Sequence, residues 1–137
     1  QAALGLSQLK KLDGFIKKRN RIVAIYHKKL KGVKDIILPA IVRNVVSASH
    51  IFIIRVKNQT KRLKLIEFLK SKGIGVNFHY PAVYSHPYYR ENGYKNLRLA
   101  NEEVYHNSCI TLPAYPGLKL KDINQVCNTI KTFFKET

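Results

Sequence analysis

Acidic residues are scarce in this chain. Of its 137 residues, 8 are Asp or Glu and 25 are Lys or Arg, so the formal net charge is +17. With so few carboxylates, a mechanism that needs a pair of acidic side chains, as in glycoside hydrolysis, is not indicated. GxGxxG, P-loop and GxSxG motifs are also missing. The dinucleotide-binding, phosphate-binding and serine-hydrolase sites that these motifs mark therefore have no support.

Cysteine is also rare, and no long apolar stretch occurs. Cys109 and Cys127 stand without a CxxC pair, and their apolar neighbours predict buried free thiols in a reducing compartment. No apolar run approaches the roughly 18–20 residues that a membrane span needs. The chain begins with Gln1 and shows no cleavable signal pattern. We therefore expect a cytoplasmic protein without a membrane segment, in the form of a fragment or a processed product.

The basic charge suggests one alternative function. A strongly basic chain is typical of modules that bind nucleic acid or other polyanions. In this chain, however, the cations are mostly lysines and are spread along the sequence. A basic nucleic-acid or polyanion-binding module is therefore kept only as the alternative hypothesis. The preferred hypothesis, which rests on the motifs described below, expects no nucleic-acid partner.

The first 31 residues predict one long helix. Their apolar side chains recur at steps of three and four, and Gly32 marks the predicted end. At 1.5 Å per residue the helix would be about 45 Å long, which is more than a globule of this size needs. We therefore expect residues 1–32 to form a long interdomain helix and residues 33–137 to form a small C-terminal α+β domain.

The rest of the chain predicts short strands and helices in alternation. The apolar run 50–56 is typical of a strand that is buried on both faces. Thr60 is the predicted cap of a helix that turns Leu63, Ile66 and Leu69 inward. The further expected elements are a strand at 76–80, a long loop at 81–100, a short helix at 101–105 capped by Asn101, a strand at 109–112 and a final helix from about Ile123 to Phe134. This order predicts an α+β fold with a small sheet covered by helices.

The most informative segment is the loop that begins with His79 and Tyr80. It is rich in proline, tyrosine and histidine, and loops of this length are commonly functional. Tyrosine hydroxyls and histidine nitrogens can donate to phosphate or sugar oxygens, and Arg90 can add a charge-assisted bond. The composition therefore predicts that this loop borders and partly covers a site for a polar, anionic ligand.

Two other interpretations of this loop stay open. Tyr88 and Tyr89 can simply pack beneath it. His79 and His86 can be metal ligands, but no carboxylate precedes Glu91 in the loop and no cysteine is near. We therefore expect no metal site.

A series of short motifs runs along the chain in a fixed order. The chain starts with QAALGLSQL, and further on come SASH, LKLIEFLKSKGIG, HYP at residues 79–81, PYY, GY and LPAYPGL. In sequence and in order, these motifs resemble those of the DegT/DnrJ/StrS sugar aminotransferases. Each motif alone is weak, but the collinear series covers nearly the whole chain.

This resemblance implies the fold and chemistry of that family. The implied fold is the small C-terminal domain of the fold type I, aspartate-aminotransferase-like fold, with a long N-terminal helix and a small, mainly antiparallel sheet. The family works as a homodimer, and pyridoxal phosphate forms a Schiff base with a lysine of a larger N-terminal domain that is absent from this chain. An amino donor, commonly glutamate, supplies the amino group for a keto group on a nucleotide-linked sugar, as in surface-glycan biosynthesis.

The resemblance also implies roles for single residues. His79 and Tyr80 match the HY pair at the family's substrate cleft, so we expect them to bind substrate. Tyr84 and His86 stand where relatives often have His and Gln, and they are further substrate-binding candidates. His50 matches a recurrent histidine whose role is expected to be structural. No catalytic residue is expected in this chain. A third hypothesis is that the protein is a family member that has lost catalysis but kept a binding role.

Overall fold

The computed structural model describes residues 1–136, in which helices alternate with short strands. The elements are α1 (Ala2–Leu9), α2 (Leu12–Leu30), β1 (Ile36–Ile37), β2 (Phe52–Val56), α3 (Gln59–Ser71), the 3₁₀ turn η1 (Val83–Ser85), α4 (Pro87–Tyr89), the π turn η2 (Arg90–Tyr94), α5 (Ala100–His106), β3 (Cys109–Leu112) and α6 (Leu120–Glu136). None of the described helices is both long enough and apolar enough to cross a membrane.

Three antiparallel strands form the sheet, with β2 in the centre between β1 and β3. Ile36 of β1 lies opposite Val56 of β2, and Phe52 at the other end of β2 lies opposite Leu112 of β3. Every second residue of β2 is buried, whereas Arg55 and Ile53 between them are half-buried. The prediction that this strand is buried on both faces was therefore wrong, because only one face of β2 packs on the helices.

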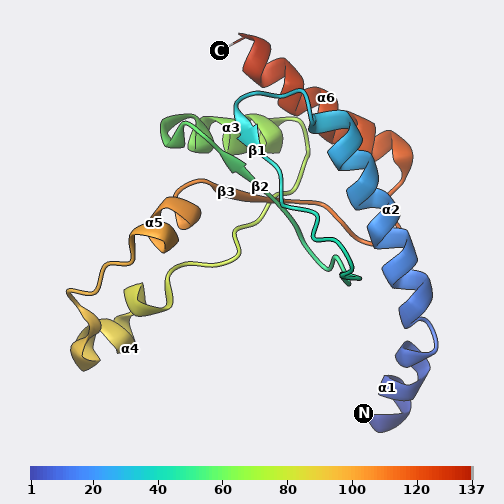
Figure 1. Cartoon of the computed structure of the whole chain (residues 1–137), viewed down its shortest axis with the longest axis horizontal. Helices are drawn as coiled ribbons and strands as arrows, with labels where there is room; N and C mark the ends of the chain where they lie inside the picture. Colours follow the sequence, from blue (N-terminus) through green and yellow to red (C-terminus); the bar gives the residue numbers. More distant parts are fainter. Residues whose placement is uncertain (137) are drawn as a thin grey trace.

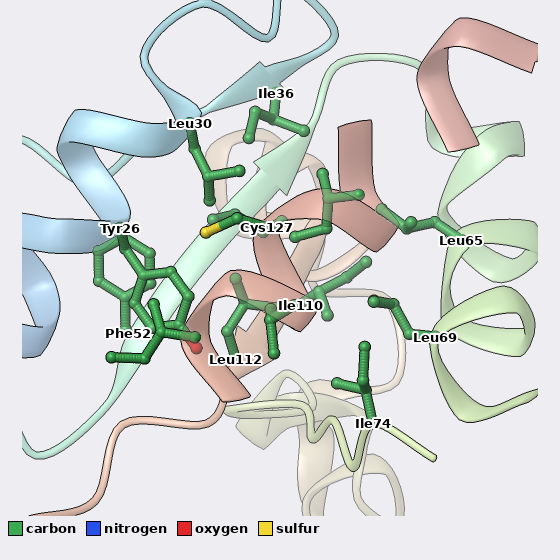
Figure 2. Close-up of a cluster of buried hydrophobic side chains, with 14 of the residues drawn as sticks. Tyr26, Leu30, Ile36, Phe52, Leu65, Leu69, Ile74, Ile110, Leu112 and Cys127 are labelled. Carbon is green, nitrogen blue, oxygen red and sulfur yellow. The ribbon is translucent and has the colours of Figure 1, made fainter. Parts of the chain in front are cut away.

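The hydrophobic core lies between the sheet and three helices. Helix α6 packs against both α2 and α3, so the apolar faces of these helices meet over the sheet. Figure 2 shows the side chains that converge there, which include Tyr26, Leu30, Ile36, Phe52, Leu65, Leu69, Ile74, Ile110, Leu112 and Cys127. The α+β fold with a small antiparallel sheet, as expected from the sequence, is thus confirmed.

Two parts of the chain project from this core toward the same side. Helix α1 continues beyond the start of α2, and residues 81–99, which we call the arm, carry the short helix α4 (Figure 1). In the view of Figure 1 both extend downward, away from α3 and the C-terminal end of α6. Helix α1 and the arm are thus the two parts of the chain that extend furthest below the core in this view.

The predicted single helix over residues 1–31 is broken in two. Lys11 donates its backbone N–H to Gln8 O at 2.9 Å, a tightened turn that separates α1 from α2. All residues of α1 are exposed, so tertiary packing does little to hold it in line with α2. Gly14, a residue with low helix propensity, lies inside α2 and does not mark the break.

Other predicted elements differ in detail. Asn58, not Thr60, caps α3, because its side-chain oxygen accepts from the Thr60 N–H. Leu63, predicted to face inward, is 62% exposed, while Leu65 takes the buried position. Residues 76–80 form no regular strand: only Asn77 pairs there, by an isolated bridge to Thr111. Helix α5 begins at Ala100 without a side-chain cap from Asn101.

Candidate functional site

His79 lies where the chain leaves the edge of the sheet. Just before it, Asn77 pairs with Thr111 of β3 through two backbone hydrogen bonds, of 2.8 and 3.2 Å. The Nδ1 atom of His79 lies 2.8 Å from the Thr111 hydroxyl oxygen. His79 is half-buried, so its ring is anchored to the sheet on one side and open on the other.

Tyr80 extends outward from this anchor. Its side chain is 71% exposed, and its ring stands edge-on against the His79 imidazole, with 4.7 Å between ring centroids. Such a pair fixes the relative orientation of two side chains that can both hydrogen-bond a ligand. Neither side chain is buried in the core of the domain.

Arg62 of α3 also contacts this segment. Its Nε donates to the Cys109 carbonyl oxygen of β3 at 2.9 Å. Its guanidinium lies over the ring of Phe78, 4.8 Å from the centroid, an arrangement that attracts a cation to an aromatic face. The residue before His79 is thus fastened to α3 while His79 is fastened to β3.

Tyr84 belongs to the arm, and its hydroxyl is hydrogen-bonded to another residue of this chain. Its hydroxyl donates to the Glu102 carboxylate of α5 at 2.8 Å. Burial, followed by this hydrogen bond, raises the pKa of the Tyr84 hydroxyl. The contact ties the arm to α5, so the donor capacity of Tyr84 is already used.

His86 and Arg90 lie further along the arm. His86 is exposed and precedes the first residue of α4. Arg90 lines a hollow of about 320 Å³ between the arm and α5, together with Lys95, Arg98 and the carboxylates of α5. Arg98 lies 3.5 Å from Glu103 in this hollow. Among residues 1–136, no hydrogen bond or ring contact joins Tyr84 or His86 to His79, so the structure brings together only His79 and Tyr80 of the four predicted substrate-binding residues.

A second hollow adjoins the segment that holds His79. It has a volume of about 530 Å³ and is lined by residues 73–77 on one side and by Thr111, Pro113, Tyr115 and Leu118 on the other. The LPAYPGL motif therefore forms one wall of this hollow. Tyr115 is exposed at its edge.

His50 stands at the end of a loop that α2 holds in place. The hydroxyl of Ser49 donates to the Asn20 side-chain oxygen, and the Asn20 amide donates to the Ser47 carbonyl oxygen at 3.0 Å. His50 itself is exposed. The SASH segment is thus anchored to α2 through Asn20.

The described residues offer no metal cluster and no enclosed lysine. No group of three or more His, Cys, Asp or Glu side chains that could hold a metal ion occurs in residues 1–136. None of the lysines in this range is buried, whereas a lysine that forms a Schiff base is usually held in a desolvated site. Taken alone, these residues do not fit a pocket for pyridoxal phosphate.

The two cysteines are buried and free. Burial raises the pKa of the Cys127 thiol to about 11, so at neutral pH it stays in its unreactive protonated form. This agrees with the prediction of buried structural thiols.

The residues that orient the site were not identified from the sequence. Thr111, Arg62, Glu102 and Asn20 each contact a predicted site residue or its neighbouring segment from a distant part of the chain. For Thr111 one signal was present, since it is a polar residue inside the apolar run of β3. A hydroxyl in that position must find a buried partner.

Comparisons with known proteins agree with the fold and with the motifs. Residues 1–131 match the family described as the DegT/DnrJ/EryC1/StrS aminotransferase family. The spore coat polysaccharide biosynthesis protein SpsC of Bacillus subtilis is 32% identical over 140 residues, which cover 98% of this chain and 36% of SpsC.

Two solved structures are similar along nearly the whole chain. Helicobacter pylori PseC, an aminotransferase involved in the biosynthesis of pseudoaminic acid, superposes with a TM-score of 0.90 at 25% identity, over 98% of this chain and 37% of PseC. The PLP-form of Spr1654 from Streptococcus pneumoniae, a sugar aminotransferase by its description, has a TM-score of 0.87 at 27% identity, over 98% of this chain and 35% of Spr1654. The chain thus spans little more than a third of the length of these proteins.

Proposed function

Because the chain belongs to the DegT/DnrJ/EryC1/StrS aminotransferase family, we propose that it is the C-terminal part of an enzyme that aminates a keto group of a nucleotide-linked sugar. The observation that carries this proposal is the family match over residues 1–131 together with the superposition on PseC. SpsC and PseC are described in terms of polysaccharide and amino-sugar biosynthesis. By analogy, glutamate is the proposed amino donor and a surface glycan the proposed destination of the product.

Pyridoxal phosphate is the proposed cofactor, since Spr1654 has a PLP-form. When bound, it supplies the electron sink for amino-group transfer. All lysines of residues 1–136 are exposed or half-buried. We therefore assign the cofactor lysine and most cofactor contacts to a larger N-terminal domain outside this chain.

The role proposed for this chain is to form one wall of the substrate cleft. His79 and Tyr80 present polar atoms beside each other, with their ring centroids 4.7 Å apart. Their ring nitrogen and hydroxyl are suited to sugar and diphosphate oxygens. Tyr84 and His86 are proposed as further contacts from the arm, and Tyr84 would have to keep or exchange its bond to Glu102.

The proposed arrangement of the full-length protein is a cytoplasmic homodimer. Residues 1–32 would link the two domains, although α1 and α2 are separate helices. Helix α1 carries three leucines that are 63–64% exposed, namely Leu4, Leu6 and Leu9. Several exposed leucines on one short helix are typical of a surface that another part of the protein covers.

Borohydride reduction in the presence of pyridoxal phosphate, followed by peptide mapping, tests the assignment of the cofactor lysine. In the full-length protein we expect one dominant modified lysine outside residues 1–137, and amination of a nucleotide-linked keto sugar with glutamate. In the chain alone we expect scattered, substoichiometric labelling of exposed lysines and no turnover, because free amines react with any aldehyde.

Two results would contradict the proposal. A single dominant modified lysine within residues 1–137 would place the cofactor site in this chain. Absence of any modified lysine in the full-length protein, with no turnover, would favour the third hypothesis, in which the protein is a family member that has lost catalysis.

A further inference from the structure

Thr111 is a buried residue of the edge strand β3, and its hydroxyl has one hydrogen-bond partner among the described residues. Thr111 is 7% exposed and lies between Ile110 and Leu112 in a strand whose four residues are all buried. Its backbone N–H and carbonyl are both used by Asn77. Within the described chain, the only hydrogen-bond partner of its side-chain oxygen is the Nδ1 atom of His79, at 2.8 Å.

The direction of this hydrogen bond follows from the cost of an unpaired donor. If the hydroxyl accepted from Nδ1–H, its own hydrogen would be buried without an acceptor, and a buried unpaired donor is costly. If the hydroxyl donates to the Nδ1 lone pair, both groups are satisfied. In a neutral imidazole one ring nitrogen accepts and the other carries the hydrogen, so His79 then carries its hydrogen on Nε2.

We propose that Thr111 is a positioning residue that holds His79 as the Nε2–H tautomer, so that His79 serves the ligand as a hydrogen-bond donor. The Tyr80 ring, edge-on to the imidazole at 4.7 Å, and Arg62, stacked on Phe78, limit rotation of the same segment. No partner of Nε2 is seen within residues 1–136. An Nε2–H group suits an acceptor such as a diphosphate or sugar oxygen.

This role explains why a threonine stands in an otherwise apolar strand. Valine has the same shape and would suit β3 equally well as a strand residue, but it would leave Nδ1 without its donor. The inference rests on the proposed function only for the identity of the ligand. The tautomer itself is a property of the protein without ligand.

The test measures the tautomer of His79 in the full-length protein by ¹⁵N NMR of histidine-labelled samples, at about pH 8, where an ordinary imidazole is neutral. His79→Gln identifies the signal. We expect the Nε2–H form to predominate in the wild type and in Thr111→Ser, which keeps the hydroxyl. In Thr111→Val the Nδ1–H form should gain population, whereas Thr129→Val, a half-buried threonine on α6, should leave the ratio unchanged.

Steady-state kinetics give the second readout, with UDP- and dTDP-linked keto sugars as probes. Thr111→Val should raise KM about tenfold, the effect of a lost hydrogen bond to a charged group, with kcat within about twofold and recovery in Thr111→Ser. A wild-type His79 in the Nδ1–H form would overturn the inference even if Thr111→Val failed to fold. An unchanged tautomer ratio in a folded Thr111→Val protein would also overturn it. If instead the tautomer is as expected but neither probe is aminated, the proposed function fails and the role of Thr111 stands.

Discussion

Ser49 has an unusual backbone for its residue type. Its φ angle is +45°, in the left-handed region, where a side chain costs roughly 1–2 kcal/mol relative to the right-handed form. Its hydroxyl donates to the Asn20 side chain, which in turn donates to the Ser47 carbonyl oxygen. The hydrogen bonds to α2 therefore hold the loop in a conformation that the backbone of Ser49 alone would disfavour.

Two substitutions at Ser49 separate the backbone from the hydrogen bond. Ser49→Ala loses the bond and keeps the unfavourable φ, whereas Ser49→Gly loses the bond and removes the penalty. We expect the alanine variant to be less stable than the glycine variant by about 1 kcal/mol, measured as the free energy of unfolding in urea.

Lys64 provides the matched control. It is an exposed residue in the interior of α3, so there alanine should be more stable than glycine by about 1 kcal/mol. The same order at both positions would show that Ser49 has an ordinary backbone conformation in solution.

At the scale of elements, the sequence predicted best where one apolar face decides the structure. The final helix was found from its apolar spacing, and Ile123, Val126, Cys127 and Ile130 are indeed buried. The predicted strand at 76–80 failed because its apolar residues do not pair: among residues 76–80, the backbone pairs with β3 only at Asn77.

The candidate site was predictable only in part for a similar reason. The HYP motif located His79 and Tyr80 on the surface, but the contacts that orient His79 come from β3 and α3. Thr111 lies 32 residues further along the chain. Local sequence patterns do not specify which side chains meet across such separations, because that depends on how the elements pack.

The cap of α3 offers a test at this scale. Asn58→Ala should lower the free energy of unfolding by about 1 kcal/mol, since it leaves the N–H at the start of the helix without its acceptor. Thr60→Ala should cost less, because the Thr60 hydroxyl only donates to Asn58. Urea titrations of both variants check this order, and a larger loss for Thr60→Ala would restore the assignment made from the sequence. Asn58→Asp, which keeps the acceptor, should be close to wild type.

At the scale of the whole molecule, the chain carries apolar surface that its own core does not use. In addition to the α1 leucines, four aliphatic residues of the loop before β2 are 62–86% exposed, namely Ile41, Val42, Val45 and Val46. Contiguous apolar surface of this kind is uncommon on monomeric proteins and marks contacts with other surfaces.

The chain produced alone should therefore self-associate and bind dyes that report apolar surface. We expect sedimentation to show concentration-dependent association. Replacing Leu4, Leu6 and Leu9 together by glutamine should reduce both the association and the dye fluorescence.

Leu63 of α3 is the control for this prediction, because it is equally exposed, at 62%, but lies away from α1. Leu63→Gln should leave the association unchanged. A chain that stays monomeric at high concentration and binds no dye would contradict the assignment of α1 as a covered surface.

The position of the arm within the sheet topology has a consequence for how the protein can vary. The arm lies in the connection between the neighbouring strands β2 and β3 and packs largely on itself and on α5. The entropy of closing a flexible connection grows only logarithmically with its length, so that doubling the length costs only about 0.6 kcal/mol. Insertions and deletions in residues 81–99 should thus accumulate at little cost to folding. A protein built in this way can lengthen or shorten one exposed segment while the hydrophobic core stays the same.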